Sequence, residues 1–190
     1  MGIRIADALK AEFSGILSDG NGIGLLAQGI SGGLPTTITF RNSQFVYSQT
    51  KGVKLVDGHS LTFDGCLFES NREEGVFMLP TSGGTLENIN FVNGCWFEDN
   101  YPADAGKYQF VAGDGSAING GTIRPVLRDV FFAGSSRTAK AVSLSGPAVA
   151  GYVLDNVQVP NLPGEINITK GAYGVLRAAP NLEPSVVSKP

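Results

Sequence analysis

The amino-acid sequence predicts an all-β chain that winds as a parallel β-solenoid, because one short strand pattern recurs along it. Five segments place an apolar residue on either side of an outward one: Ile38–Phe40, Leu61–Phe63, Ile89–Phe91, Val130–Phe132 and Val157–Val159. A second apolar pair follows each of them, at Val53/Leu55, Val76/Met78, Tyr108/Phe110, Val142/Leu144 and Ile166/Ile168. Recurring units of about 20 to 30 residues, with short strands and no helical periodicity, are typical of solenoids.

The spacing of these units is uneven in one region. Phe40 and Phe63 are 23 residues apart, whereas Phe91 and Phe132 are 41 residues apart. The second apolar pairs spread out in the same part of the chain. We therefore expect inserted loops near residues 99–125 within an otherwise regular stack.

Composition excludes several classes of partner. Of the 190 residues, 42% are hydrophobic and 16% are charged, and the formal net charge is -3. The hydrophobic share is enough for a continuous core, but the sequence has no basic patch to neutralise a phosphate backbone, so we expect no nucleic-acid partner. The apolar stretches are far too short to cross a bilayer, so we expect no membrane insertion.

Residues 1–19 are predicted to form an N-terminal cap. Ile5, Leu9, Phe13 and Ile16 fall at helical spacing, which predicts a short amphipathic helix with one buried face. The open end of a solenoid exposes unpaired backbone and core residues, and such a helix would cover them.

Residues 20–170 are predicted to form the solenoid itself. Successive side chains of a strand point to opposite sides, so the apolar set must face the interior. Equivalent residues of neighbouring coils then lie about 4.8 Å apart, which predicts an aromatic ladder of Phe40, Phe63 and Phe91. Cys66 and Cys95 occupy matching positions with apolar neighbours, and we expect them to form a reduced, stacked interior pair.

Polar residues are expected to stack as well. The segments Phe68–Asn71 and Phe97–Asn100 are 29 residues apart and match closely, as Phe-Glu-Ser-Asn and Phe-Glu-Asp-Asn. This match places Asn71 beside Asn100 at a bend, where side-chain amides can bond along the stack.

The C-terminal residues 171–190 are predicted to form a strap or tail, because Pro180 and Pro184 exclude regular structure around them. No cofactor or metal is expected. Gly22–Ala27 matches the pattern GxGxxA, but no strand–turn–helix unit surrounds it. The two cysteines have no CxxC spacing and no histidine partner.

Two phrases carry a resemblance to a known family. Leu86–Phe91 reads Leu-Glu-Asn-Ile-Asn-Phe and Leu154–Val159 reads Leu-Asp-Asn-Val-Gln-Val. With second strands like Asn-x-x-Gly-Val and the N-terminal helix, they resemble the right-handed parallel β-helix of the pectin-lyase-like superfamily, most closely bacteriophage tailspikes. The resemblance covers roughly residues 20–170. It specifies a fold and not a reaction, because the same solenoid hosts lyases, hydrolases, epimerases and adhesins.

The resemblance to tailspikes implies a homotrimer, located in the virion tail or outside the cell. Such proteins bind, and often cleave, a bacterial surface polysaccharide, either capsule or lipopolysaccharide, during host attachment. The chain is short for a complete tailspike, so we expect a fragment or a compact member. The alternative is a structural, trimerising segment of a longer spike or adhesin without sugar binding. Catalysis stays open at this point, as does the choice between a hydrolase and a lyase.

The candidate catalytic residues are Glu69, Glu98 and Asp99. Glu69 and Glu98 are expected to point outward at equivalent places in adjacent coils, with Asp99 beside them. Glycoside hydrolysis usually takes two carboxyl groups, and two stacked acids that share a proton give one of them a raised pKa. The alternative is that both glutamates are solvated surface charges, which are common on outer faces.

The candidate substrate-binding residues are Trp96, Phe77, Asn71 and Asn100. If Cys95 and Phe97 face inward, Trp96 faces outward, where an indole is a platform for the apolar face of a sugar ring. Phe77 is also outward by alternation. For Trp96 and Phe77 the alternative is a contact between subunits.

Overall fold

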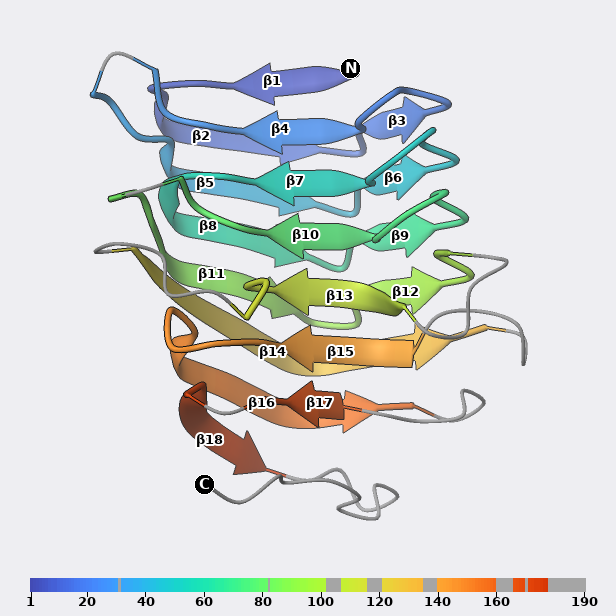
Figure 1. Cartoon of the computed structure of the whole chain (residues 1–190). Coiled ribbons are helices and arrows are strands. Elements are labelled where there is room, and N and C mark those ends of the chain that lie inside the picture. The colour runs from blue at the N-terminus through green and yellow to red at the C-terminus, as the bar shows by residue number, and fades with distance from the viewer. Residues whose placement is uncertain are drawn as a thin grey trace.

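The computed structural model is a stack of parallel coils with β1 at one end and β18 at the other (Figure 1). It describes residues 1–30, 32–81, 83–101, 107–115, 121–134, 140–159, 166–169 and 171–177. The strands are β1 (Ile3–Ile5), β2 (Leu9–Ser14), β3 (Leu17–Asp19), β4 (Leu25–Ala27), β5 (Thr36–Arg41), β6 (Gln44–Val46), β7 (Val53–Leu55), β8 (Gly58–Asp64), β9 (Leu67–Glu69), β10 (Val76–Met78), β11 (Thr85–Val92), β12 (Trp96–Glu98), β13 (Tyr108–Ala112), β14 (Thr122–Ala133), β15 (Lys140–Leu144), β16 (Ala150–Gln158), β17 (Ile166–Ile168) and β18 (Tyr173–Arg177).

All strand pairings among the described residues are parallel. These residues contain no helix, and therefore no helix that could span a membrane. The predicted all-β parallel solenoid is confirmed.

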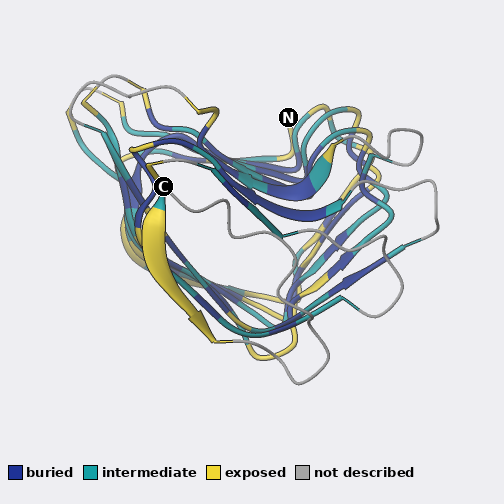
Figure 2. Cartoon of the chain, turned by 60° about the horizontal axis from the view of Figure 1, so that its bottom comes forward, coloured by how far each residue is buried: buried dark blue, intermediate teal, exposed yellow. Residues whose placement is uncertain are grey.

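Each regular coil has three walls. A seven-stranded sheet, in the order β1-β4-β7-β10-β13-β15-β17, forms the first wall. An eleven-stranded sheet forms the other two: β2, β5, β8 and β11 make a long-strand arm, and β3, β6, β9 and β12 make a short-strand arm. The two arms meet at β14, which pairs with both β11 and β12. Figure 2 shows the walls enclosing the interior of the coils, with many of the wall residues buried.

The predicted N-terminal helix is wrong, because residues 3–19 form a first complete coil. β1, β2 and β3 pair with β4, β5 and β6. Asp7, Lys10 and Gly15 have φ angles of 51°, 52° and 64°, which a right-handed helix does not allow. Leu9 is 77% exposed, so the apolar stripe that suggested a helix does not face one side.

Bends of the coils are built from residues in the left-handed conformation, stacked in three columns. Their φ angles lie between 47° and 65°. The columns are Lys10, Thr37, Ser60 and Asn88; Gly15, Asn42, Gly65, Asn93, Asp129 and Asn156; and Gly20, Tyr47, Ser70 and Asp99. The second column consists only of glycine, asparagine and aspartate, which adopt this conformation most readily, whereas the other two columns also contain lysine, threonine, serine and tyrosine.

The core contains two aromatic ladders. Phe13, Phe40, Phe63 and Phe91 stack along the long-strand arm, with ring centroids 4.8 to 5.4 Å apart. Phe45, Phe68, Phe97 and Phe132 stack along the short-strand arm. The rings of the two ladders meet edge to face, as Phe63 does with Phe68 at 5.8 Å. The predicted ladder of Phe40, Phe63 and Phe91 is confirmed.

The register breaks from the predicted one at β14. Leu127, and not Phe132, is the partner of Phe91, while Phe132 pairs with Phe97. The reason is that β14 runs for 12 residues through the bend that separates β11 from β12 in the coil before it. Similarly, Val76 and Met78 pair with Phe110 and Ala112, two residues beyond the expected partner Tyr108.

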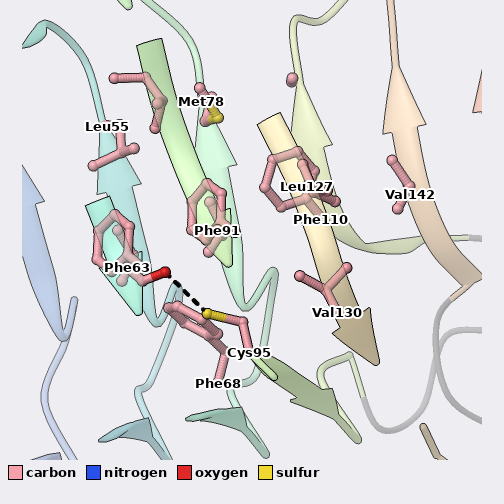
Figure 3. Close-up of a cluster of buried hydrophobic side chains, with 14 of the residues drawn as sticks. Leu55, Phe63, Phe68, Met78, Phe91, Cys95, Phe110, Leu127, Val130 and Val142 are labelled. Atoms are coloured by element: carbon pink, nitrogen blue, oxygen red, sulfur yellow. Dashed lines mark hydrogen bonds between the residues drawn. The ribbon is translucent and has the colours of Figure 1, made fainter. Parts of the chain in front are cut away.

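The two cysteines lie inside the solenoid as predicted. Both are free thiols and both are buried. The backbone N–H of Cys66 points to the Cys95 sulfur at 3.4 Å, and the Cys95 thiol donates to the Phe63 carbonyl at 3.2 Å (Figure 3). Burial raises the pKa of the Cys95 thiol, which keeps it protonated.

At the C-terminal end the described chain extends the stack by one strand. β18 pairs with β16, and all five of its residues are exposed. Residues 178–190, which include Pro180 and Pro184 of the predicted strap, lie outside the described residues.

Candidate functional site

Two predicted acids are register partners on the short-strand arm. β9 and β12 pair in parallel, so that Glu69 lies opposite Glu98. The residues just before them, Phe68 and Phe97, are fully buried, and the alternation of the strand turns both glutamates outward. Both are half-buried. Since adjacent strands lie about 4.8 Å apart, the two carboxyl groups project side by side.

Asp99 completes an acidic group at the end of β12. It follows Glu98 directly and has a φ angle of 48°, which places it on a bend of the coil. Burial raises the pKa of the Glu69 carboxyl, and the negative charges of Glu98 and Asp99 raise it further. Glu98 and Asp99 are therefore close enough to Glu69 to act on it electrostatically.

Trp96 lies beside the acids and contacts one of them. Its side chain is 37% exposed, and its indole N–H donates a hydrogen bond to Glu98 Oε2 at 2.9 Å. One face of the indole stacks on Phe131, with centroids 5.4 Å apart and planes 22° apart. This hydrogen bond fixes the position of the Glu98 carboxyl beside the indole ring. The neighbouring acids Glu69 and Glu98 thus have different surroundings.

An outward apolar row accompanies the acids. Leu67 pairs with Trp96, and Trp96 pairs with Phe131, so three large side chains lie next to one another across three strands. Alternation predicted the outward position of Phe131. The sequence did not indicate that Phe131 lies beside Trp96, because their pairing depends on the register between β12 and β14. We call Leu67, Glu69, Trp96, Glu98, Asp99 and Phe131 the acid–aromatic strip.

Phe77 does not belong to this strip. It lies on β10, in the seven-stranded sheet, and pairs with Lys54 and Val111. It lines a hollow of about 290 Å³ on the outer face of that sheet. The ammonium group of Lys51 sits 5.0 Å from the centroid of its ring.

Asn71 and Asn100 are wholly buried and form the predicted ladder. The Asn71 amide donates to Asn100 Oδ1 at 2.8 Å and to the Phe45 carbonyl at 3.0 Å. The Asn100 amide donates to the Phe68 carbonyl and to Gln109 Oε1, both at 2.9 Å. Since both side chains are inaccessible and fully used within the protein, we assign them a structural role and no contact with a ligand.

The two acids in the turn after Asn71 also have partners within the protein. Glu73 and Glu74 both pair with Lys51, and Tyr101 Oη donates to Glu74 Oε1 at 3.3 Å. Burial disfavours the charged form of Lys51, but these two glutamates outweigh that effect and raise its pKa. No group of three or more histidine, cysteine or acidic side chains in the described part of the chain is arranged to hold a metal ion.

Comparison with known proteins identifies the architecture. The family model described as "Right handed beta helix region" matches residues 15–124, which is more than half of the chain. Neither the comparison with curated proteins nor that with solved structures gives a match. The matched residues run from the first coil into β14 and include the acids and Trp96 of the strip.

Proposed function

The chain belongs to the right-handed β-helix family, and from that premise we propose that it binds a bacterial surface polysaccharide along its short-strand arm. In this proposal it is a tailspike-type protein that attaches a phage to its host as a homotrimer, in the virion or outside the cell. The polymer is capsule or lipopolysaccharide.

The acid–aromatic strip is the observation that carries the proposal. Outward side chains of successive coils repeat at about the strand spacing of 4.8 Å, which suits a ligand that itself repeats. Trp96 offers an amphipathic ring beside the carboxylates of Glu69 and Glu98, which accept hydrogen bonds from sugar hydroxyls. The half-buried state of both acids limits competition from water.

Hydrolysis of the bound polymer is a second candidate function, favoured by the unequal surroundings of the two glutamates. Glu69, with its raised pKa, is the proposed general acid that protonates the glycosidic oxygen. Glu98, which the Trp96 N–H holds in place, is the proposed nucleophile or base. Carboxyl groups about 5 Å apart are typical of enzymes that retain the anomeric configuration, and neighbouring strands provide a spacing of that size.

The test incubates the protein with a panel of capsular and lipopolysaccharide chains, and it measures binding by calorimetry and cleavage by the release of reducing ends. A Glu69→Gln, Glu98→Gln double variant should lose cleavage by at least about 100-fold if the acids are catalytic. A Glu12→Gln variant is the matched control, because Glu12 is an exposed acid on the other arm.

Each result has a distinct meaning. Binding without reducing ends supports the binding function and rejects hydrolysis, while unchanged cleavage by the double variant removes the acids from catalysis. An unsaturated sugar product identifies elimination, which is lyase chemistry. Absence of binding to every polymer supports the alternative, a structural segment of a longer spike. A light-scattering mass of one chain rejects the homotrimer.

A further inference from the structure

The outer face of the seven-stranded sheet carries a hollow that the polysaccharide proposal does not use. Figure 2 shows this sheet as the upper wall of the coil, bowed inward between projecting loops. The hollow has a volume of about 290 Å³. Its lining consists of Ile23, Leu26, Gln28, Lys54, Val56, Phe77, Leu79, Pro80 and Thr81. Six of these nine side chains are apolar, so the hollow accepts an apolar body.

Strand register builds the floor of the hollow. Leu26, Lys54 and Phe77 are register partners on β4, β7 and β10 and form one outward row. Val56 and Leu79 follow β7 and β10 directly and continue the apolar surface. Pro80 and Thr81 stand in the loop that comes next. The hollow therefore spans three coils, all of them in the regular part of the stack.

The two lysines near the hollow, Lys51 and Lys54, differ in whether acidic side chains neutralise their charge. Lys51 lies over the Phe77 ring, but Glu73 and Glu74 neutralise it. Lys54 has no ion pair and no side-chain hydrogen bond among the described residues, and no acid lines the hollow. The side chains of Gln28 and Thr81 likewise have no hydrogen-bond partner in the described part of the protein. One uncompensated cation thus faces an apolar surface, with two neutral polar groups beside it.

We propose that this hollow binds a small carboxylic acid with an apolar body, such as an aryl or short alkyl carboxylate. The carboxylate pairs with the Lys54 ammonium, and the apolar body covers Leu26, Val56 and Phe77. Pockets for small molecules commonly combine a mostly apolar lining with a few polar groups that fix orientation. A sugar fits this lining poorly, because its many hydroxyls would face aliphatic side chains without partners.

The site is independent of the acid–aromatic strip, since it lies on the other sheet. Failure of either proposal leaves the other untouched.

The test titrates the full chain with 3-phenylpropionate and follows binding by calorimetry and by backbone amide shifts. We expect saturable binding with a Kd below about 1 mM and shifts at Leu26, Val56 and Phe77. The neutral isostere 3-phenylpropanamide should bind at least about tenfold more weakly, because it lacks the charge-assisted bond. Acetate, which has the charge without the apolar body, should not bind.

Variants test whether the Lys54 ammonium group is the partner of the carboxylate. Lys54→Met keeps the methylene stem in the hollow and removes the ammonium, so it should bring the acid and the amide to equal affinity. Lys107→Gln, an exposed lysine outside the hollow, is the control and should change nothing. The proposal is overturned if 3-phenylpropionate causes no shifts at the hollow, if glucuronate or acetate binds equally well, or if Lys54→Met retains the preference for the acid. The probes on the unaltered chain decide the question even if Lys54→Met does not fold.

Discussion

Two equivalent segments, Glu69–Asn71 and Glu98–Asn100, each carry a carboxylate and an amide that face opposite environments. In both segments the glutamate comes two residues before the asparagine. The glutamates are half-buried on the outer surface, whereas both asparagines are 0% exposed. A left-handed residue stands between them in each segment, Ser70 in one and Asp99 in the other. That bend redirects the chain, so the same ladder geometry makes an interaction surface outside and a hydrogen-bonded spine inside.

The stacking of equivalent side chains therefore has opposite energetic consequences inside and outside the wall of the solenoid. Inside, each amide donates to and accepts from its neighbours, so the ladder satisfies buried polar groups. Outside, like charges stack, and the pKa of Glu69 rises in consequence of burial and of its acidic neighbours. A ladder of amides stabilises the fold, whereas a ladder of acids is tolerated at some cost and is therefore the better candidate for function.

Removal of an interior amide should have the largest effect. Asn71→Ala leaves the backbone N–H of Ser48 and the Phe45 carbonyl without their present partner, and it also breaks the bond to Asn100. We expect a loss of about 2 to 4 kcal/mol in the free energy of unfolding. Urea denaturation measures it. Gln44→Ala, an exposed polar residue on the same arm, is the control and should change stability by less than about 0.5 kcal/mol. Equal effects of the two changes would contradict the structural role of the ladder.

A methyl group beside the same spine should be the next most harmful change. A Cβ added at Gly52 would lie 2.7 Å from Asn71 Nδ2 and 2.7 Å from the Gly75 carbonyl oxygen. We therefore expect Gly52→Ala to cost about 1 to 3 kcal/mol in thermal or urea unfolding. At Gly22 the nearest atom to an added Cβ is 3.6 Å away. Gly22→Ala should consequently be close to neutral, and a similar loss there would show that crowding at the spine is not the cause.

Changes on the outer side should affect binding more than stability. Trp96→Ala removes a ring that is 37% exposed, so stability should fall little. Affinity for the polysaccharide should fall about tenfold, which corresponds to about 1.4 kcal/mol of lost contact. Calorimetry against the polymer that the protein binds measures this. Tyr173→Ala, at an exposed aromatic on β18, serves as the control. An unchanged affinity in Trp96→Ala would exclude the strip as the binding surface.

The smallest expected effect is a pH dependence of stability at Glu69. Its pKa is raised in the folded protein, so the protonated form is favoured by folding and the ionised form carries a penalty. Relative to Glu69→Gln, the unaltered chain should therefore lose stability as the pH rises above about 4, the usual pKa of a glutamate carboxyl, until Glu69 is fully ionised in the folded protein. The difference should stay below about 1 kcal/mol, because water screens a half-exposed carboxyl. Melting curves over this range measure it, and an opposite slope would mean that the pKa is lowered.

Much of the candidate site was predictable from alternation alone. The repeated Phe-Glu segments placed Phe68 and Phe97 inside and Glu69 and Glu98 outside, and the same reasoning turned Trp96 outward. The ladder of Asn71 with Asn100 and the interior pair of cysteines followed from the 29-residue match. The prediction that both asparagines contact a ligand was wrong, since the match does not show on which side of the wall a bend residue finally lies.

Other features depended on contacts between distant segments. The contact between Trp96 and Phe131 needs the register of β14, and that register follows from a 12-residue strand that continues through the bend at Asp129. The first coil was hidden because Ile5, Leu9, Phe13 and Ile16 happen to share helical spacing, while the pairing of β1 with β4 is not visible locally. The hollow joins three coils, and its free cation is recognised only after the partners of Lys51 are known.

The sequence by itself determined the class of fold and the inward set of side chains in the regular coils. These features are local, because strand alternation has a period of two. Only the tertiary structure decided which residues become neighbours across coils, and hence which acids interact, which amides are buried and which of Lys51 and Lys54 is neutralised by acids. In a parallel stack those neighbours are more than 20 residues apart, and hydrogen bonds between coils, rather than the local pattern, set their register.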